Sequence, residues 1–562
     1  MNNKDSRIIL EYQHNDFSYQ KSKSNLNISF NRVAFIFFIF FIISIIYSVH
    51  LMHLGSRESG VKINSKINKQ INNLYRADIV DANYDYIGKT IGSIDIGISP
   101  SKIIDEKKLI INLKYIFPNK NFNEVQKRID KGKFFYLEKK VSDKNYEKLM
   151  QLGDKSIEPR DNLIRIYPQR NLFSHIIGQI DNENNGISGL EKSLDKDLKD
   201  TLDPIQLTVH KDIQFLVRDG LKKFNEIFRT KGSAAILMNV NNGEILSLVS
   251  LPDFDPNKRK KIDDVNYINR ATKGVYEFGS VFKTFTLAAA LNEKIIEPET
   301  EFVDLPKTLT CAGFSIKEYD NQIPSNLSAE QILIRSGNIG SVRIGQKVGV
   351  DKFESFLSKI GILGEINFDI EEVGKPIKFN WGKCPLATAS FGHGITTTLL
   401  QLSKAYSIIV NGGYEIHPTL IKSNKKRKSR KILNEEVSEK ILPILRKIVT
   451  TKEGTASLAN VNGFEIGGKT GTAQKSIAGG YSKKKINTFL SVFPTSKPKF
   501  VFAIMLDEPK TSKDYIYHYR DGSNIKYKGT PYNTAGWTTV EVAGQIIEEI
   551  GPILATKYSE IN

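Results

Sequence analysis

The first residues that could do chemistry are a serine and a lysine three positions apart in an apolar stretch. Ser280 and Lys283 lie in the segment YEFGSVFK at positions 276–283. Residues three apart share one face of a helix, and burial lowers the pKa of a lysine until it can accept a proton. Ser280 and Lys283 could therefore act as a nucleophile and its base. The spacing alone is common, because Ser-x-x-Lys recurs in charged or loop-like contexts at Ser18, Ser59, Ser193, Ser423, Ser482, Ser496 and Ser523.

The elements around this pair predict an α+β domain. The segment GSVFKTFTLAAALNE predicts a helix starting near Ser280, whose N-terminus offers free N–H groups and positive potential. Two apolar runs flank Asn241-Asn242-Gly243, which is typical of a β-hairpin. NTFLSVFP and KFVFAIMLDEP read as paired strands, and TVEVAGQIIEEIG reads as a closing helix. We therefore expect one sheet with helices on its faces.

Two further motifs follow at long range. RSGNIG places Ser336 and Asn338 at Ser-x-Asn spacing, and EIGGKTGTAQ contains a Lys-Thr-Gly triplet followed by threonine. Alone, the first is usually a turn and the second a strand end. In this order, with 56 residues from Ser280 to Ser336 and 133 from there to Lys469, they are hard to attribute to chance.

The three motifs resemble the signature set of penicillin-binding proteins and serine β-lactamases. The resemblance to class B penicillin-binding proteins covers the chain from the apolar N-terminal segment onward. It includes LYRADIVDANYDYIG at 74–88, RIYPQRNLFSHIIGQID at 165–181 and SFGHGITTTLLQLSKAYSIIVNGG at 390–413. TAGWTTVEVAGQII at 534–547 looks like the septal, division-specific subgroup. The chain departs from the family pattern at Phe278, where proline is usual, and at Gly337, where serine is frequent.

The resemblance implies a peptidoglycan D,D-transpeptidase that cross-links stem peptides through an acyl-enzyme. Ser280 would be the nucleophile and Lys283 its base. Ser336 would relay a proton toward the leaving amine, Asn338 would hold the substrate amide, and Lys469 would set the electrostatic field.

Substrate binding is expected at the Lys-Thr-Gly motif. By resemblance, Thr470, Gly471 and Thr472 bind the substrate, with the two hydroxyls on its terminal carboxylate. Backbone N–H groups of Ser280 and Thr472 would form the oxyanion hole. β-Lactam antibiotics, which mimic the substrate, would acylate the same serine, and no metal or cofactor is expected.

Two histidines in the similar segments could suggest further catalytic groups. We expect His175 and His393 to be structural.

The chain is expected to have four parts: a cytoplasmic tail (1–32), a transmembrane anchor (33–52), a pedestal of the dimerisation type (53–205) and the transpeptidase domain (206–562). Val33 to Val49 carries no charge and is nearly long enough to span a bilayer. A signal peptide is the alternative, but no A-x-A cleavage pattern follows. The basic residues before the span predict a cytoplasmic N-terminus, a periplasmic catalytic domain and a single pass through the inner membrane.

The composition of the chain limits the kinds of binding partner that we expect. The formal charge is +18, but lysine, asparagine and isoleucine are abundant everywhere, so much of the charge reads as solvated surface. The densest basic run, NKKRKSRK at 424–431, has no interleaved aromatic residues, and we expect no nucleic acid. No polymerase domain is evident, so a polytopic glycan polymerase and other division proteins are expected partners. The chain has two cysteines, Cys311 and Cys384, and the sequence does not decide whether they form a disulfide.

Four other functions remain open. An elongation-specific transpeptidase would share the chemistry. A membrane-bound β-lactamase is a second alternative, although hydrolysis of β-lactams as such needs neither a pedestal nor an anchor. A β-lactam sensor would be expected to have several membrane spans or a cytoplasmic signalling domain. A scaffold without catalysis would tolerate loss of motif residues, yet all are present.

Overall fold

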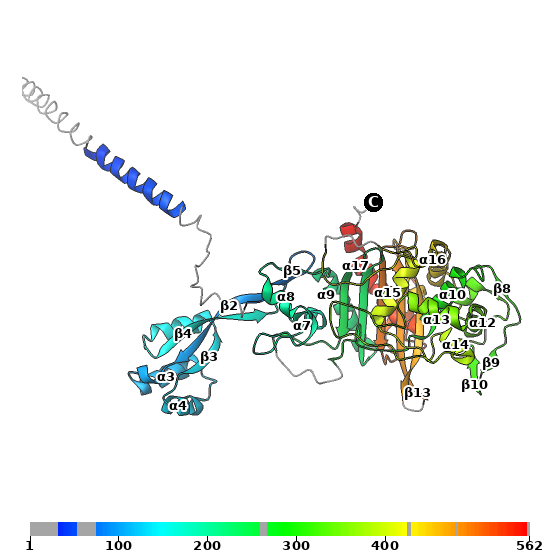
Figure 1. Cartoon of the computed structure of the whole chain (residues 1–562), viewed down its shortest axis with the longest axis horizontal. Helices are drawn as coiled ribbons and strands as arrows, with labels where there is room; N and C mark the ends of the chain where they lie inside the picture. The colour runs from blue at the N-terminus through cyan, green and yellow to red at the C-terminus, as the bar shows by residue number, and fades with distance from the viewer. Residues whose placement is uncertain are drawn as a thin grey trace, which may run out of the picture. The chain divides into compact units, whose positions relative to one another are not determined.

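The computed structural model describes residues 32–52, 75–258, 267–311, 313–423, 429–477 and 480–558. The chain forms two compact units, Met1–Asn73 and Leu74–Asn562. In the first, a helix of 21 residues, Arg32–Met52, is long and apolar enough to cross a membrane. This helix is blue in Figure 1. Its apolar side chains are exposed, as expected for a single-pass membrane anchor.

The second unit begins with the pedestal, a five-stranded sheet with helices. The strands follow the order β3-β2-β1-β5, and β4 also pairs with β2. They are β1 (Ile79–Val80), β2 (Tyr86–Ile98), β3 (Phe135–Val141), β4 (Ile157–Ile166) and β5 (Ile205–Gln206). Its helices are α3 (Glu106–Ile116), α4 (Phe122–Asp130), α5 (Asp143–Gln151), α6 (Ser174–Ile177), α7 (Gly189–Ser193) and α8 (Asp195–Asp200).

The pedestal has a small core of its own. Leu109 and Leu113 of α3 are buried with Ile96 and Ile98 of β2, apart from the main core. The expected boundary at 205/206 falls inside β5, which pairs in parallel with β1. The four-part division therefore stays a prediction at this point.

A five-stranded antiparallel sheet forms the centre of the catalytic part, in the order β12-β13-β14-β6-β7. Its strands are β6 (Gly232–Asn239), β7 (Ile245–Leu251), β12 (Gly467–Ile477), β13 (Gly480–Phe493) and β14 (Phe500–Asp507). Every residue of β6, β7 and β14 is buried, so both faces of the sheet are covered. Figure 1 shows these strands in green and orange among the helices. Strand β12 lies at one edge.

Two pairs of helices pack on this sheet. Helices α9 (Lys211–Ile227) and α17 (Thr539–Tyr558) form one pair, and α15 (Leu399–Val410) with α16 (Glu435–Thr450) forms the other. The expected hairpin around Asn241-Gly243, the paired strands β13 and β14 and the closing helix α17 are all confirmed. The predicted α+β fold is correct.

The remaining elements form a helical region beside the sheet. Its helices are α10 (Phe282–Asn292), α11 (Ala329–Ile334), α12 (Asn338–Val348), α13 (Val350–Lys359) and α14 (Lys383–Ala389). A hairpin of β9 (Thr308–Cys311) and β10 (Phe314–Lys317) lies in the same part of the chain. Cys311 and Cys384 form a disulfide that ties this hairpin to α14, which answers the question that the sequence left open.

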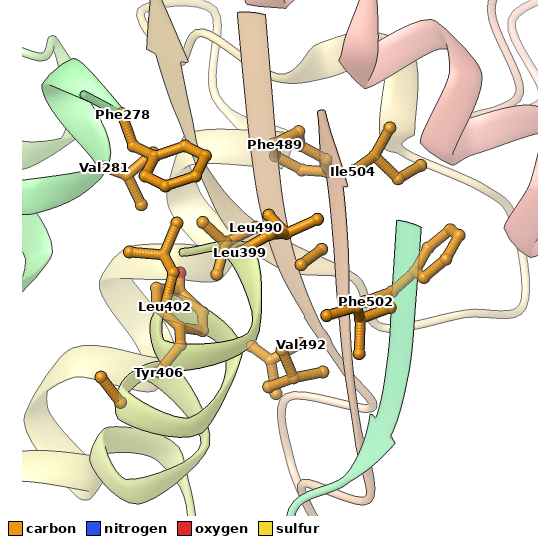
Figure 2. Close-up of a cluster of buried hydrophobic side chains, with 14 of the residues drawn as sticks. Phe278, Val281, Leu399, Leu402, Tyr406, Phe489, Leu490, Val492, Phe502 and Ile504 are labelled. Atoms are coloured by element: carbon orange, nitrogen blue, oxygen red, sulfur yellow. The ribbon is translucent and has the colours of Figure 1, made fainter. Parts of the chain in front are cut away.

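The hydrophobic core reaches the turn that carries Ser280. Figure 2 shows Leu402 and Tyr406 of α15 lying near Leu490 of β13, with Phe278 and Val281 at the edge of the same cluster. Phe278 and Val281 are fully buried. The residues on either side of Ser280 are therefore fixed by packing, and this holds the serine in place.

Candidate active site

Ser280 lies in the short 3-10 helix η4 (Gly279–Val281), which leads directly into α10. The helix begins at Phe282, two residues later than the sequence suggests. Gly279 has φ +57°, and a Cβ there would lie 2.8 Å from the backbone oxygen of Thr472. The turn thus packs tightly on β12, and Ser280 itself is half-buried.

Lys283 is buried one helical turn beyond the serine, with 1% of its surface exposed. Its Nζ donates to the backbone oxygen of Ser336, to Ser336 Oγ at 3.2 Å and to Asn338 Oδ1 at 2.7 Å. Burial lowers the pKa of Lys283 to about 7, although the negative charge of Glu318 acts in the opposite direction. Among the described residues, the lysine bonds to the Ser-x-Asn motif and not to Ser280.

The Ser-x-Asn motif joins α11 to α12. Ser336 has φ +58° and is buried, and Asn338 is the first residue of α12. Asn338 Nδ2 donates to the backbone oxygen of Lys317 at 2.8 Å. The backbone N–H of Asn338 donates to Glu318 Oε2 at 2.7 Å. One of the two amide protons of Asn338 remains for a substrate.

Lys469 approaches the same serine from β12. It is fully buried, and its Nζ donates to Ser336 Oγ at 2.8 Å and to the backbone oxygen of Thr470 at 3.2 Å. Burial lowers the pKa of Lys469, and the nearby charge of Lys283 lowers it further. Ser336 Oγ thus accepts from two lysines, which uses both lone pairs and leaves its proton free to point elsewhere.

Thr470, Gly471 and Thr472 follow along the edge strand. Thr470 Oγ1 lies 2.7 Å from Thr455 Oγ1, and Thr472 Oγ1 accepts from the backbone N–H of Ala535 at 3.0 Å. A Cβ on Gly471 would lie 2.2 Å from the backbone oxygen of Phe278. Glycine is therefore required at 471 so that β12 can approach the turn of Ser280.

These residues surround a cleft of about 980 Å³. Residues from all three motifs line it, namely Ser280, Ser336, Asn338, Thr470 and Thr472. Lys283 and Lys469 do not line the cleft but lie buried behind it. The sequence thus identified residues that the fold brings together from three distant segments.

The two histidines differ in position. His175 is half-buried, its Nε2 lies 2.9 Å from the backbone oxygen of Pro252, and desolvation lowers the pKa of the ring. That position is consistent with a structural role. His393 lines the cleft, and its ring centroid lies 4.5 Å from that of Tyr481. Tyr481 donates to Glu277 Oε1 at 3.0 Å.

Sequence reasoning missed several residues of this site, chief among them Glu318, Thr455 and Ala535. Glu318 and Thr455 belong to no quoted segment, and Ala535 lies in the segment 534–547 without a role assigned to it, so only three-dimensional contacts reveal their part in the site. No group of three or more His, Cys, Asp or Glu among the described residues is placed to hold a metal ion. The expectation that the chemistry needs no metal stays a prediction.

Comparison with known proteins decides the family. The model of the penicillin binding protein transpeptidase domain matches residues 233–523. The chain belongs to this family. The penicillin-binding protein dimerisation domain matches residues 72–215, so the chain has the two-domain class B architecture.

Relatives within the family are similar over most of the chain. A probable peptidoglycan D,D-transpeptidase FtsI of Caulobacter vibrioides (strain NA1000 / CB15N) is 29% identical over 86% of this chain and 82% of its own length. A probable peptidoglycan D,D-transpeptidase PenA of Neisseria meningitidis is 28% identical over 67% of this chain and 70% of its own. Stage V sporulation protein D of Bacillus subtilis is 29% identical over 73% of this chain and 70% of its own.

Proposed function

We propose that this penicillin-binding protein is a peptidoglycan D,D-transpeptidase that cross-links stem peptides through an acyl-enzyme on Ser280. One observation carries the proposal. Ser280 lies at the wall of a cleft, and behind the cleft a buried lysine with a pKa near 7 bonds to the second motif. Relatives named as peptidoglycan D,D-transpeptidases support the same substrate.

In the first step, Ser280 Oγ attacks the carbonyl carbon of the D-Ala-D-Ala peptide bond. Its proton passes to Lys283, which is about half neutral at pH 7 because its pKa is about 7. Backbone N–H groups of Ser280 and Thr472 are proposed to bind the oxyanion of the tetrahedral intermediate. Lys283 bonds to Ser336 and Asn338 in this structure, and the proton transfer is proposed to bring its Nζ within hydrogen-bond distance of Ser280 Oγ.

The C–N bond then breaks, and the leaving D-Ala amine takes a proton from Ser336. That hydroxyl is reprotonated by Lys283, since Lys283 Nζ already donates to Ser336 Oγ. An acceptor amine next attacks the ester carbonyl and gives up a proton along the same path, which restores Ser280. The cleaved peptide bond drives the transfer.

The donor peptide is proposed to bind along the free edge of β12. An extended peptide can add to a sheet edge through backbone hydrogen bonds. The hydroxyls of Thr470 and Thr472 would then bind its terminal carboxylate, and Lys469 would add positive potential behind them. The free amide proton of Asn338 would hold a substrate carbonyl.

The cellular role is proposed from the anchor and the relatives. The apolar helix Arg32–Met52 fits a single-pass membrane anchor. We propose a cytoplasmic N-terminus, a periplasmic catalytic part and a role in septum synthesis with a glycan polymerase and other division proteins. Protease added to spheroplasts should digest the catalytic part, and a fluorescent fusion should gather at the division site. Full protection from protease would reverse the topology, and a fusion confined to the side wall would favour the elongation role.

The chemistry is tested by fluorescent penicillin and mass spectrometry. Wild-type protein should retain the label through gel electrophoresis, and the adduct should lie on a peptide that contains Ser280. An adduct on Ser482, which has the same Ser-x-x-Lys spacing, would contradict the assignment. Rapid return to the unmodified mass, with hydrolysed drug accumulating, would instead indicate a β-lactamase.

A further inference from the structure

We propose that Glu318 is a positioning residue for acylation: its carboxylate fixes the first turn of α12 and so holds Ser336 and Asn338 against Lys283. Glu318 follows β10 and belongs to none of the three motifs. The inference rests on the proposed function, because it assigns a role within the same cleft.

The carboxylate of Glu318 caps α12 from another segment. Its Oε2 accepts from the backbone N–H of Asn338 at 2.7 Å, and its Oε1 accepts from that of Ile339 at 2.9 Å. N–H groups in the first turn of a helix have no partner inside the helix. The residue before α12 is Gly337, which has no side chain to cap it. A negative charge is also favourable at this end of a helix.

The same segment also holds the side chain of Asn338. Asn338 Nδ2 donates to the backbone oxygen of Lys317, the neighbour of Glu318, while its Oδ1 accepts from Lys283 Nζ at 2.7 Å. The backbone and the side chain of Asn338 are therefore fixed by two consecutive residues. Through Asn338, the position of Glu318 reaches the catalytic lysine.

Two further contacts keep this segment in place. Tyr319 donates its hydroxyl proton to the backbone oxygen of Arg335 at 2.8 Å, directly before the Ser-x-Asn motif. The disulfide between Cys311 and Cys384 ties the preceding hairpin to α14. The carboxylate of Glu318 thus projects from an anchored segment.

The charges around Lys283 make the role of Glu318 testable. Lys283 is the only charged residue of α10. Among the described residues, Glu318 from the segment after β10 acts on its charge, Lys469 from β12 lies close enough for the charge of Lys283 to lower its pKa, and α12 presents the neutral Asn338. The buried side chains of α11, α13 and α16, which also pack on α10, are apolar or hydroxyl-bearing. Because Glu318 raises the pKa of Lys283 against the effect of burial, removing its charge should lower that pKa further.

The test measures the rate of penicillin acylation against pH in full-length protein in detergent. Glu318→Gln keeps the size of the side chain but removes the charge and one of the two acceptors, because an amide nitrogen cannot accept from an N–H. The acidic limb of its rate profile should move to lower pH by about 0.5 to 1 unit, less than the shift of about 1 to 3 units for directly paired groups. Glu318→Asp keeps the charge, so the acidic limb of its rate profile should stay at the wild-type pH. Glu318→Ala removes both acceptors and should slow acylation about tenfold or more.

The matched control is Glu330→Gln. Glu330 lies in the first turn of α11, pairs at the surface with Lys447 and does not line the cleft. This variant should acylate as wild type does. Melting curves should confirm that each variant is folded, and if Glu318→Ala is not, the Gln and Asp variants decide.

The outcomes separate this inference from the proposed function. Wild-type labelling at Ser280 with an acidic limb that is unchanged in Glu318→Gln would overturn the role of Glu318 alone, whatever the rate of the Ala variant. Absence of labelling in the wild-type protein would overturn the proposed function itself. A limb that moves in Gln and not in Asp supports the proposal.

Discussion

The pedestal and the catalytic cleft bury charged side chains in opposite ways. In the pedestal, Arg76 and Arg165 both contact Glu191, and all three side chains are fully buried. Arg76 also contacts Asp195, and the hydrogen bonds from Lys199 and Arg76 outweigh burial and lower the pKa of that carboxyl to about 2. Each of these charges faces an opposite charge.

Behind the catalytic cleft, two buried lysines instead share neutral partners. Lys283 and Lys469 both donate to Ser336 Oγ, and neither makes an ion pair among the described residues. A buried charge without a charged partner shifts its pKa toward the neutral form. The comparison teaches that pairing keeps the pedestal charges fixed and structural, whereas burial without an ion pair lowers the pKa of both lysines, that of Lys283 to about 7.

The largest expected effect comes from removing the unpaired catalytic lysine. Lys283→Ala should slow acylation by penicillin about 10²- to 10⁴-fold, the usual contribution of a general base. Ser280→Ala should abolish acylation, and the double variant should be no worse, because the pair acts as a unit. Time courses with fluorescent penicillin measure this. Lys196→Ala, at the exposed Ser-x-x-Lys match of Ser193, is the control that should change nothing.

Breaking the paired cluster should affect stability and not chemistry. Glu191→Gln leaves Arg165 without a charged partner and Arg76 with Asp195 alone, and removing one member of a buried ion pair costs about 3–5 kcal/mol of unfolding free energy. Denaturant titration measures the loss, while the folded fraction should acylate at the wild-type rate. Glu124→Gln, which breaks an exposed pair with Arg128, should leave stability unchanged. A stable Glu191→Gln protein would mean that the cluster is not the structural element inferred here.

A smaller effect is expected at the carboxylate site. Thr472→Val keeps the shape but deletes the hydroxyl, and losing a hydrogen bond to a charged group costs about 1.5–3 kcal/mol, or about tenfold or more in acylation. The same substitution removes the acceptor of the Ala535 N–H. Thr472→Ser restores the oxygen and should recover most of the rate. If the Val variant acylates at the wild-type rate, the hydroxyl of Thr472 does not contribute to the site.

The smallest effect concerns stability and pH. The pKa of Lys283 is about 7 in the folded protein and about 10.5 when unfolded, so between these values the unfolded state binds more protons. Its contribution therefore makes the protein more stable as pH rises from about 7 to 10.5. Lys283→Met lacks this pH-dependent contribution. The free energy of unfolding of the variant minus that of the wild type should therefore fall by up to about 1.4 kcal/mol per pH unit in that window. Denaturant titrations at pH 7.5 and 9.5 measure the gap, and a constant gap would contradict the lowered pKa.

Much of the catalytic part followed from the sequence alone. The order and spacing of the motifs around Ser280, Ser336 and Lys469 indicated the family, which the domain match confirms. The hairpin at Asn241-Gly243 and the closing helix were predictable because turn residues and hydrophobic periodicity are local signals. The apolar run from Val33 likewise indicated the helix Arg32–Met52, which is long and apolar enough to cross a membrane.

The tertiary structure alone decided the partners of those residues. Lys283 bonds to Ser336 and Asn338, more than fifty residues away, and Glu318 caps the helix that carries Asn338. The pairing of Cys311 with Cys384 spans 73 residues. No local pattern records such contacts, because they depend on which distant surfaces pack together when the core forms. The low pKa of Lys283 has the same origin: the sequence supplied the lysine, and burial without an ion pair lowered its pKa.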